Sequence, residues 1–234
     1  DVYLVKTDSM GVEEWSRTFG GSSEDTAYSV EETSDGGYII TGYTSSFGAG
    51  NSDIYLVKTD SMGVEEWSRT FGGSDSDNGD SVQQTSDGGY IIAGRTFSFG
   101  AGGMDIYLVK TDSQGLEEWS RTFGGSGEDY GGTVQVTSDG GYIITGNTQS
   151  FGAGGRDAYL VKTDSMGVEE WSRTFGGSGE DYGWAVQETS DGGYIITGST
   201  QSFGAGNSDV YLVKTDSMGF EEWSRIFDGS GWDT

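Results

Sequence analysis

A segment of 21 residues recurs along the chain at constant spacing. DVYLVKTDSMGVEEWSRTFGG begins at Asp1, and close copies begin at Asp53, Asp105, Asp157 and Asp209. The spacing is 52 residues each time, so 234/52 = 4.5 units are present, four full units and a half unit. The units from Asp105 and Asp157 share 43 of 52 positions, so we expect equivalent residues in equivalent environments. The sequence therefore predicts one repeat array over residues 1–234.

Composition decides which kind of array this is. The chain has 43 Gly among 234 residues, and it shows no apolar stripe with helical spacing, which excludes helical arrays. A period of 52 residues is too long for one coil of a β-solenoid, and the two halves of a unit do not resemble each other. Periods of about 40–50 residues are typical of propeller blades. The predicted fold is therefore an all-β propeller.

Each unit predicts four short strands. In the second unit they are IYLVKTD, EEWSRTFGG, DSVQQT and YIIAGRT, with an Asp-Gly-Gly turn between the last two. YIIAG is the most apolar run and carries small residues at Ala93 and Gly94, so we expect it to be the innermost strand. DSVQQT is the most polar and is expected at the outer edge. The predicted order from inside to outside is YIIAG, YLVKT, WSRTF, SVQQT.

With that order the chain predicts four-stranded antiparallel blades, about five in number, and an incomplete ring. One outer and one inner strand are missing from the predicted set. Three explanations stay open: a fragment of a longer array, a ring left open, or closure by self-association with another chain.

Residues 175–206 carry a resemblance to a known family. FGGSGEDYGWAVQETSDGGYIITGSTQSFGAG, followed by SDVYLVKTD, resembles the secreted bacterial and archaeal β-propeller repeat abbreviated SBBP. That family's pattern runs from Gly-Gly-Ser through an Asp, a strand and an Asp-Gly turn to Y-x-x-G-x-T-x-S, and all four full units follow it. This chain has Phe-Gly-Ala-Gly where the family commonly has Phe-Pro. The resemblance implies an exported or cell-surface protein, and it brings no catalytic residues.

Charge and composition exclude several functions. The formal net charge is 12 − 38 = −26, which disfavours nucleic acid and anionic lipid as partners. The chain has no His and no Cys, so it holds no Ser-His-Asp or Cys-His nucleophile, no disulfide and no zinc site built on those residues. No apolar run approaches the length of about 20 residues that spans a bilayer, and no signal peptide opens the sequence. We expect no cofactor other than calcium.

Residues that recur in every unit are expected to be structural. Trp15 and its four equivalents are predicted to pack between blades. Ten of the twelve basic residues also recur, and we expect each either to form a cross-strand ion pair or to lay its aliphatic stem along the strand with its charge in solvent. They are Lys6, Lys58, Lys110, Lys162, Lys214, Arg17, Arg69, Arg121, Arg173 and Arg225.

An acidic loop after WSRTF holds the clearest hint of metal chemistry. In the second unit it reads DSDNGD, and Asp75, Asp77 and Asp80 alternate like the oxygen ligands of a calcium loop. The interpretation without a metal is a glycine-rich turn whose aspartate accepts backbone N–H bonds. Both interpretations stay open, with calcium as the candidate ion.

Positions that differ between units mark candidate ligand contacts. They gather in this acidic loop and after the YIIAG strand, where Tyr43, Arg95, Asn147 and Ser199 correspond. Aromatic and basic side chains outside the repeat pattern are the candidates, since loops on a rigid scaffold commonly carry recognition. They are Trp184, Trp232, Tyr28, Arg95 and Arg156.

Three functional hypotheses result. The first is a non-enzymatic extracellular or surface propeller acting as scaffold or adhesion repeat. The second is a lectin-like propeller that binds glycan, or else protein, at the variable loops with one shallow site per blade. The third is a polysaccharide-active enzyme that uses only Asp and Glu. Adjacent carboxylates such as Glu65 and Glu66 point to opposite faces of a strand, which makes catalysis the least favoured hypothesis.

Overall fold

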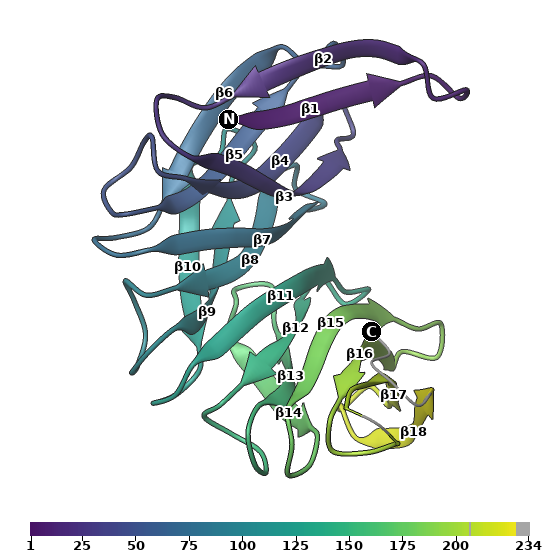
Figure 1. Ribbon diagram of the computed structural model, residues 1–234. Helices are drawn as coiled ribbons and strands as arrows, with labels where there is room; N and C mark the ends of the chain where they lie inside the picture. Colours follow the sequence, from purple (N-terminus) through teal and green to yellow (C-terminus); the bar gives the residue numbers. More distant parts are fainter. Residues whose placement is uncertain (206, 228–234) are drawn as a thin grey trace. The chain divides into compact units, whose positions relative to one another are not determined.

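The fold consists of repeated antiparallel sheets (Figure 1). A computed structural model describes residues 1–205 and 207–227, and this part of the chain contains 18 strands and no helix. In particular, none of the described residues belongs to a helix with the length and apolarity needed to cross a membrane. Four consecutive strands build each four-stranded sheet, and two further strands at the N-terminal end build a two-stranded sheet. The predicted all-β propeller of four-stranded antiparallel blades is therefore confirmed.

The strands recur with the sequence repeat. The two-stranded sheet is β1 (Val2–Thr7) with β2 (Glu13–Phe19). The first strands of the four blades are β3 (Asp25–Glu32), β7 (Asp77–Gln84), β11 (Asp129–Val136) and β15 (Asp181–Glu188). The second strands are β4 (Tyr38–Thr44), β8 (Tyr90–Thr96), β12 (Tyr142–Thr148) and β16 (Tyr194–Thr200). The third strands are β5 (Asp53–Thr59), β9 (Asp105–Thr111), β13 (Asp157–Thr163) and β17 (Asp209–Thr215). The fourth strands are β6 (Glu65–Phe71), β10 (Glu117–Phe123), β14 (Glu169–Phe175) and β18 (Glu221–Phe227).

The strand order within a blade differs from the predicted one. YIIAG does pair with YLVKT, and YLVKT with WSRTF, as expected. The polar SVQQT strand, however, pairs with YIIAG and forms the first edge of the blade instead of the last. Each blade is therefore a simple meander, which begins at the acidic loop and ends with EEWSRTF.

Packing between blades shows that the polar first strand is the inner one. Strand β7 packs against β3, β4 and β5 of the preceding blade, and β15 packs in the same way against β11, β12 and β13. The first strand of one blade thus contacts the first strand of the neighbouring blade, as inner propeller strands do. The prediction that SVQQT lies outside was wrong because polarity marks both edges of a blade, and polarity alone does not tell the inner edge from the outer.

The chain divides into two compact units. One comprises Asp1–Phe99 with Leu108–Ser120, and the other comprises Gly100–Tyr107 with Arg121–Thr234. The first contains β1–β8 and the second contains β11–β18, while β9 and β10 contribute residues to both. Strands β1 and β2 repeat the sequence of a third and a fourth strand.

The core lies in the middle strands of the blades. Every residue of β5, β9 and β13 is buried. In the second compact unit, Leu160 of one blade and Val213 of the next belong to a single apolar cluster. Burial of apolar area contributes about 25 cal/mol per Å², so these strands supply much of the folding free energy.

Trp15, Trp67 and Trp171 pack between blades, as predicted, whereas Trp223 on β18 is 39% exposed. Trp171 lies with its ring centroid 5.7 Å from that of Tyr194, on the second strand of the following blade. The hairpin tip at Gly219 lies so close that a Cβ there would be 2.5 Å from the Trp171 ring. The same contacts join Trp15 to Tyr38 and Trp67 to Tyr90.

A β-bulge interrupts the first strand of each blade and explains a recurring glycine. In β7 the pairing with β8 jumps between Gly79 and Ser81, which leaves Asp80 unpaired. Opposite this bulge, a Cβ on Gly94 would lie 1.9 Å from the carbonyl oxygen of Asn78. The sequence analysis explained the small residue at Gly94 by a place in the innermost strand, and that explanation was wrong. The glycine is required because the bulged backbone of the inner strand approaches it.

The equivalent glycine of the third blade provides a test. We expect Gly146→Ala to lower the free energy of unfolding by about 1–3 kcal/mol, because its Cβ would lie 1.9 Å from the carbonyl oxygen of Tyr130. Gly103→Ala is the control, since the nearest atom to a Cβ there is 3.1 Å away. Urea unfolding of both variants measures the difference. Equal stability of the two variants would contradict the bulge.

Candidate functional site

The acidic loop is held by one buried aspartate. The Asp77 carboxylate accepts hydrogen bonds from the Gly73 N–H at 2.8 Å, from the Ser98 hydroxyl at 2.6 Å and from the Thr96 hydroxyl. Asp77 is completely buried. These bonds join the start of the first strand to the end of the second. Asp25, Asp129 and Asp181 make the same contacts in the other blades.

The residues predicted to bind calcium have different surroundings. Asp77 is occupied by the three donors just described, and Asp75 is exposed with its backbone N–H bonded to Ser98. Asp80 forms an ion pair with Arg95 at 3.6 Å. Within residues 1–205 and 207–227, no three acidic side chains gather where they could hold a metal ion. The contacts of Asp77 match the turn interpretation, and calcium binding by these three residues stays a prediction.

The two interpretations predict different variant behaviour. We expect Asp77→Ala to lower the free energy of unfolding by about 1–3 kcal/mol in calcium-free buffer, because it leaves buried donors without an acceptor. Asp75→Ala, at the exposed position of the same loop, should leave stability unchanged. Thermal unfolding with calcium and with chelator measures both variants. If both substitutions lower stability only when calcium is present, the result would support the metal site.

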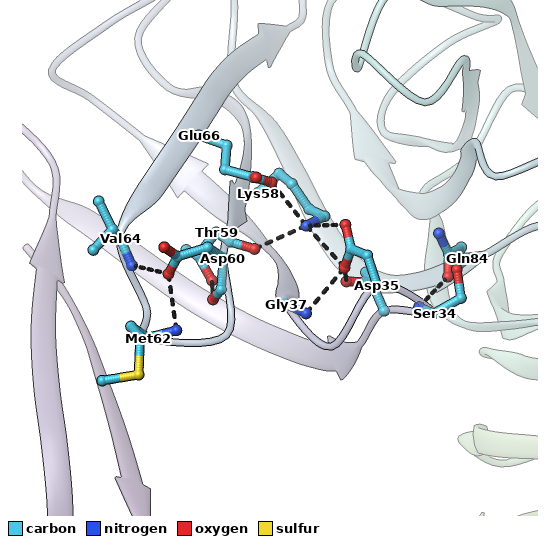
Figure 2. A network of polar contacts seen from close by, with 11 residues as sticks. Ser34, Asp35, Gly37, Lys58, Thr59, Asp60, Met62, Val64, Glu66 and Gln84 are labelled. Atoms are coloured by element: carbon cyan, nitrogen blue, oxygen red, sulfur yellow. Dashed lines mark hydrogen bonds and ion pairs between the residues drawn. The ribbon is translucent and has the colours of Figure 1, made fainter.

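The repeated lysines form ion pairs, as predicted; Figure 2 shows those of Lys58. The Lys58 ammonium is 2.9 Å from Asp35 and 2.9 Å from Glu66, and it donates to the Thr59 carbonyl at 2.8 Å. The Asp35 carboxylate also accepts from the Thr33 hydroxyl at 2.6 Å. Hydrogen bonds from Thr33 and Gly37, together with Lys58, lower the pKa of Asp35 to about 2. Lys110, Lys162 and Lys214 have equivalent partners.

Glu66 is not a free partner of Glu65. The pairing of β5 with β6 shifts so that Lys58 faces Trp67 and Thr59 faces Glu65, which leaves Glu66 in a bulge. Its carboxylate turns to the ammonium of Lys58. The Glu66 carboxylate is thus engaged by Lys58 and is not free to act together with Glu65.

The side chains that vary between blades occupy the bulge of the first strand. The structure places Tyr28, Asp80 and Trp184 there, within the first strands, whereas the sequence analysis assigned Tyr28 and Trp184 to the acidic loop and began the predicted strand DSVQQT at Asp80. Bulges re-aim side chains and are over-represented next to functional sites. The second variable set, which includes Tyr43 and Arg95, lies on the neighbouring second strand. The two sets are therefore cross-strand neighbours on the inner part of each blade.

In the first of the two compact units, three of the candidate residues, Tyr28, Asp80 and Arg95, come together. The Tyr28 and Tyr43 rings lie 5.9 Å apart between centroids, and Arg95 is within hydrogen-bonding range of the Tyr28 hydroxyl as well as paired to Asp80. One carboxylate oxygen of Asp80 is buried without a hydrogen-bond donor. Burial raises the pKa of Asp80 to about 6, although Arg95 opposes the shift. We name Tyr28, Tyr43, Asp80 and Arg95 the first cluster.

The raised pKa of Asp80 makes stability depend on pH. Because its folded pKa of about 6 exceeds the ordinary value of 3.8, the ionised carboxylate costs folding free energy as the pH rises through 6. We expect Asp80→Asn to stabilise the protein by up to about 3 kcal/mol at pH 7.5, and to give no such gain below pH 4. Urea unfolding at both pH values measures the gain, with Asp75→Asn as the exposed control. Destabilisation at pH 7.5 would show that the Arg95 ion pair outweighs burial.

In the second compact unit, Arg156 and Trp184 belong to another group of side chains, which we name the second cluster. Arg156 donates to Glu128 at 2.9 Å and to the Tyr130 hydroxyl at 3.1 Å, and its guanidinium lies 4.4 Å from the centroid of the Tyr130 ring. The Trp184 ring stacks on Tyr182 with centroids 5.2 Å apart and an angle of 3°. Its members are Glu128, Tyr130, Gln149, Arg156, Glu180, Tyr182 and Trp184. The remaining candidate, Trp232, lies outside the described residues.

The sequence analysis did not single out Tyr130 or Tyr182. The signal was present, because this position reads Thr26, Asn78, Tyr130 and Tyr182 in the four blades and thus differs between units. It lies two residues before the bulge residue that was singled out. A count of variable positions along the whole first strand would have found both tyrosines.

Comparison with known proteins gives little functional information. No family model matches the chain, so the SBBP resemblance stays a prediction. The chain is similar to the regulatory protein FlaEY of Caulobacter vibrioides, with 27% identity over 179 residues, which are 65% of this chain. This chain spans only 18% of FlaEY.

Two solved structures resemble the fold. A protein of unknown function from Bacteroides caccae has a TM-score of 0.54 and 11% identity, over 94% of this chain and 73% of its own. A subtype N11 neuraminidase-like protein of A/flat-faced bat/Peru/033/2010 (H18N11) has a TM-score of 0.45 and 11% identity, over 97% of this chain and 58% of its own. The strand topology and the sequence repeat support one conclusion, an all-β propeller-type fold with a 52-residue repeat.

Proposed function

We propose that this chain is a non-catalytic recognition module of an exported or surface-attached protein. In this proposal the repeated parts of the blades are a scaffold, and the inner-strand side chains that vary bind a ligand. The export expectation depends on the SBBP resemblance. The ligand proposal depends on the two clusters.

One observation carries the proposal: differences between near-identical blades gather at cross-strand neighbours. In the first blade the bulge residue and its neighbour are Tyr28 and Tyr43, and in the second they are Asp80 and Arg95. In contrast, the aspartate, lysine and tryptophan contacts repeat from blade to blade. A scaffold with variable side chains at one place is typical of binding proteins.

The absence of His and Cys from the sequence favours binding over catalysis. The carboxylates that recur are also engaged, since Asp77 accepts three hydrogen bonds and Glu66 pairs with Lys58. An enzyme restricted to Asp and Glu needs a carboxylate pair that faces one substrate bond. The Glu65–Glu66 pair is unsuited to this role.

The experiment is a search for ligands with a matched pair of variants. The full chain is applied to arrays of glycans and of surface proteins, and any captured ligand is measured again with the double variant Tyr28→Ser, Arg95→Ser and with Trp184→Ser. We expect at least one of these to weaken binding tenfold or more. The control is Met62→Ser, which changes an exposed residue of the β5–β6 hairpin. Silent arrays, or equal binding by all variants, would contradict a recognition role.

A further inference from the structure

The second cluster contains an exposed aromatic surface. Trp184 is 55% exposed, although burial of its indole would be favourable. Its ring is nearly parallel to that of Tyr182 and stacks on it, with an angle of 3° and 5.2 Å between centroids. The equivalent bulge residues of the first two blades, Tyr28 and Asp80, belong to no such parallel stack. Sequence variation has thus placed a flat apolar surface at one position of one blade.

This surface is held in place before any ligand arrives. The Tyr182 hydroxyl donates to Glu180 at 3.2 Å, and the backbone N–H of Gly183, between the two rings in sequence, donates to the Asn147 side chain at 2.9 Å. A ring fixed by its neighbours loses little conformational freedom on binding, which favours affinity.

Polar groups lie beside the rings. Arg156 is within hydrogen-bonding range of Tyr182 and is bonded to Glu128 and to Tyr130. In the orientation that satisfies its neighbours, the Gln149 side-chain oxygen accepts from Arg156 at 2.9 Å. The site therefore combines one apolar face with donors and acceptors at its border. Most small-molecule sites share this combination of apolar lining and a few placed polar groups.

The charges narrow the ligand class. A polyanion is repelled by the net charge of −26, and this argues against stacked nucleic-acid bases despite the aromatic rings. An organic cation would compete with Arg156, whose guanidinium already occupies the face of Tyr130. A sugar ring without charge has an apolar C–H face that packs on an indole, and its hydroxyls donate to carboxylates and accept from a guanidinium.

We propose that Trp184 and Tyr182 form a stacking surface for one sugar ring of an uncharged polysaccharide. Arg156 and Glu180 bind the hydroxyls of that ring. This inference rests on the proposed recognition function and names the ligand class of its second cluster.

The test is affinity electrophoresis and isothermal titration of the full chain with soluble uncharged glucan and mannan, and with polygalacturonate as the anionic comparison. We expect binding to an uncharged polysaccharide, and at least tenfold weaker binding by Trp184→Ala. Trp184→Tyr keeps an aromatic ring, and its affinity should lie between those of the wild type and of Trp184→Ala. Phe220→Ala is the control, because it removes an exposed aromatic side chain of the β17–β18 hairpin that belongs to neither cluster, and it should bind like the wild type.

Thermal unfolding separates binding from folding. If Trp184→Ala unfolds early, the comparison of Trp184→Tyr and Trp184→Phe with the wild type decides, since both keep a ring of graded size. Binding to polygalacturonate alone, equal loss by Phe220→Ala, or no binding to uncharged polysaccharide overturns this inference. In each case the recognition function survives if the arrays find a ligand that the variants of the first cluster lose, and it fails with this inference if they find none.

Discussion

A buried aspartate at the start of every first strand fixes the geometry of each blade. Isolated burial of a carboxylate is costly, and here hydrogen bonds to the charged oxygens offset that cost. Two of the three donors to Asp77 are the hydroxyls of Thr96 and Ser98, at the end of the second strand and just beyond it. The aspartate therefore sets where the first strand begins to pair with the second, and the bulge follows three residues later.

This constraint links the scaffold to the candidate site. Once the register is fixed, the bulge brings the first-strand backbone so close to the second strand that Gly94 and its equivalents have no room for a side chain. The bulge residue itself is released from pairing, and its side chain can change without loss of a ladder hydrogen bond. Tyr28, Asp80 and Trp184 occupy this position in three blades. Variation is tolerated there because the rest of the blade determines the backbone.

The sequence predicted the repeat, the four strands, the Trp packing and the Lys ion pairs, because each depends on local pattern or on recurrence. It misplaced SVQQT, since polarity describes exposure without saying which edge is exposed. It found Tyr28 and Trp184 as variable residues but assigned them to a loop, because a bulge leaves no recognisable pattern in a polar strand. The pairing of Asp80 with Arg95 depends on which strands are neighbours, and the predicted order had separated SVQQT from YIIAG.

The distribution of positive charge gives the two clusters their character. Each recurring lysine contacts a glutamate, and the recurring arginines lie against tryptophan or donate to carbonyl groups. The two basic residues outside the repeat, Arg95 and Arg156, each belong to one cluster. In a chain of net charge −26, a guanidinium beside tyrosines supplies a local donor that the surrounding acidic surface lacks. The recognition proposed at these places would therefore depend on hydrogen bonding and stacking more than on long-range attraction, which is the physical reason to seek an uncharged ligand.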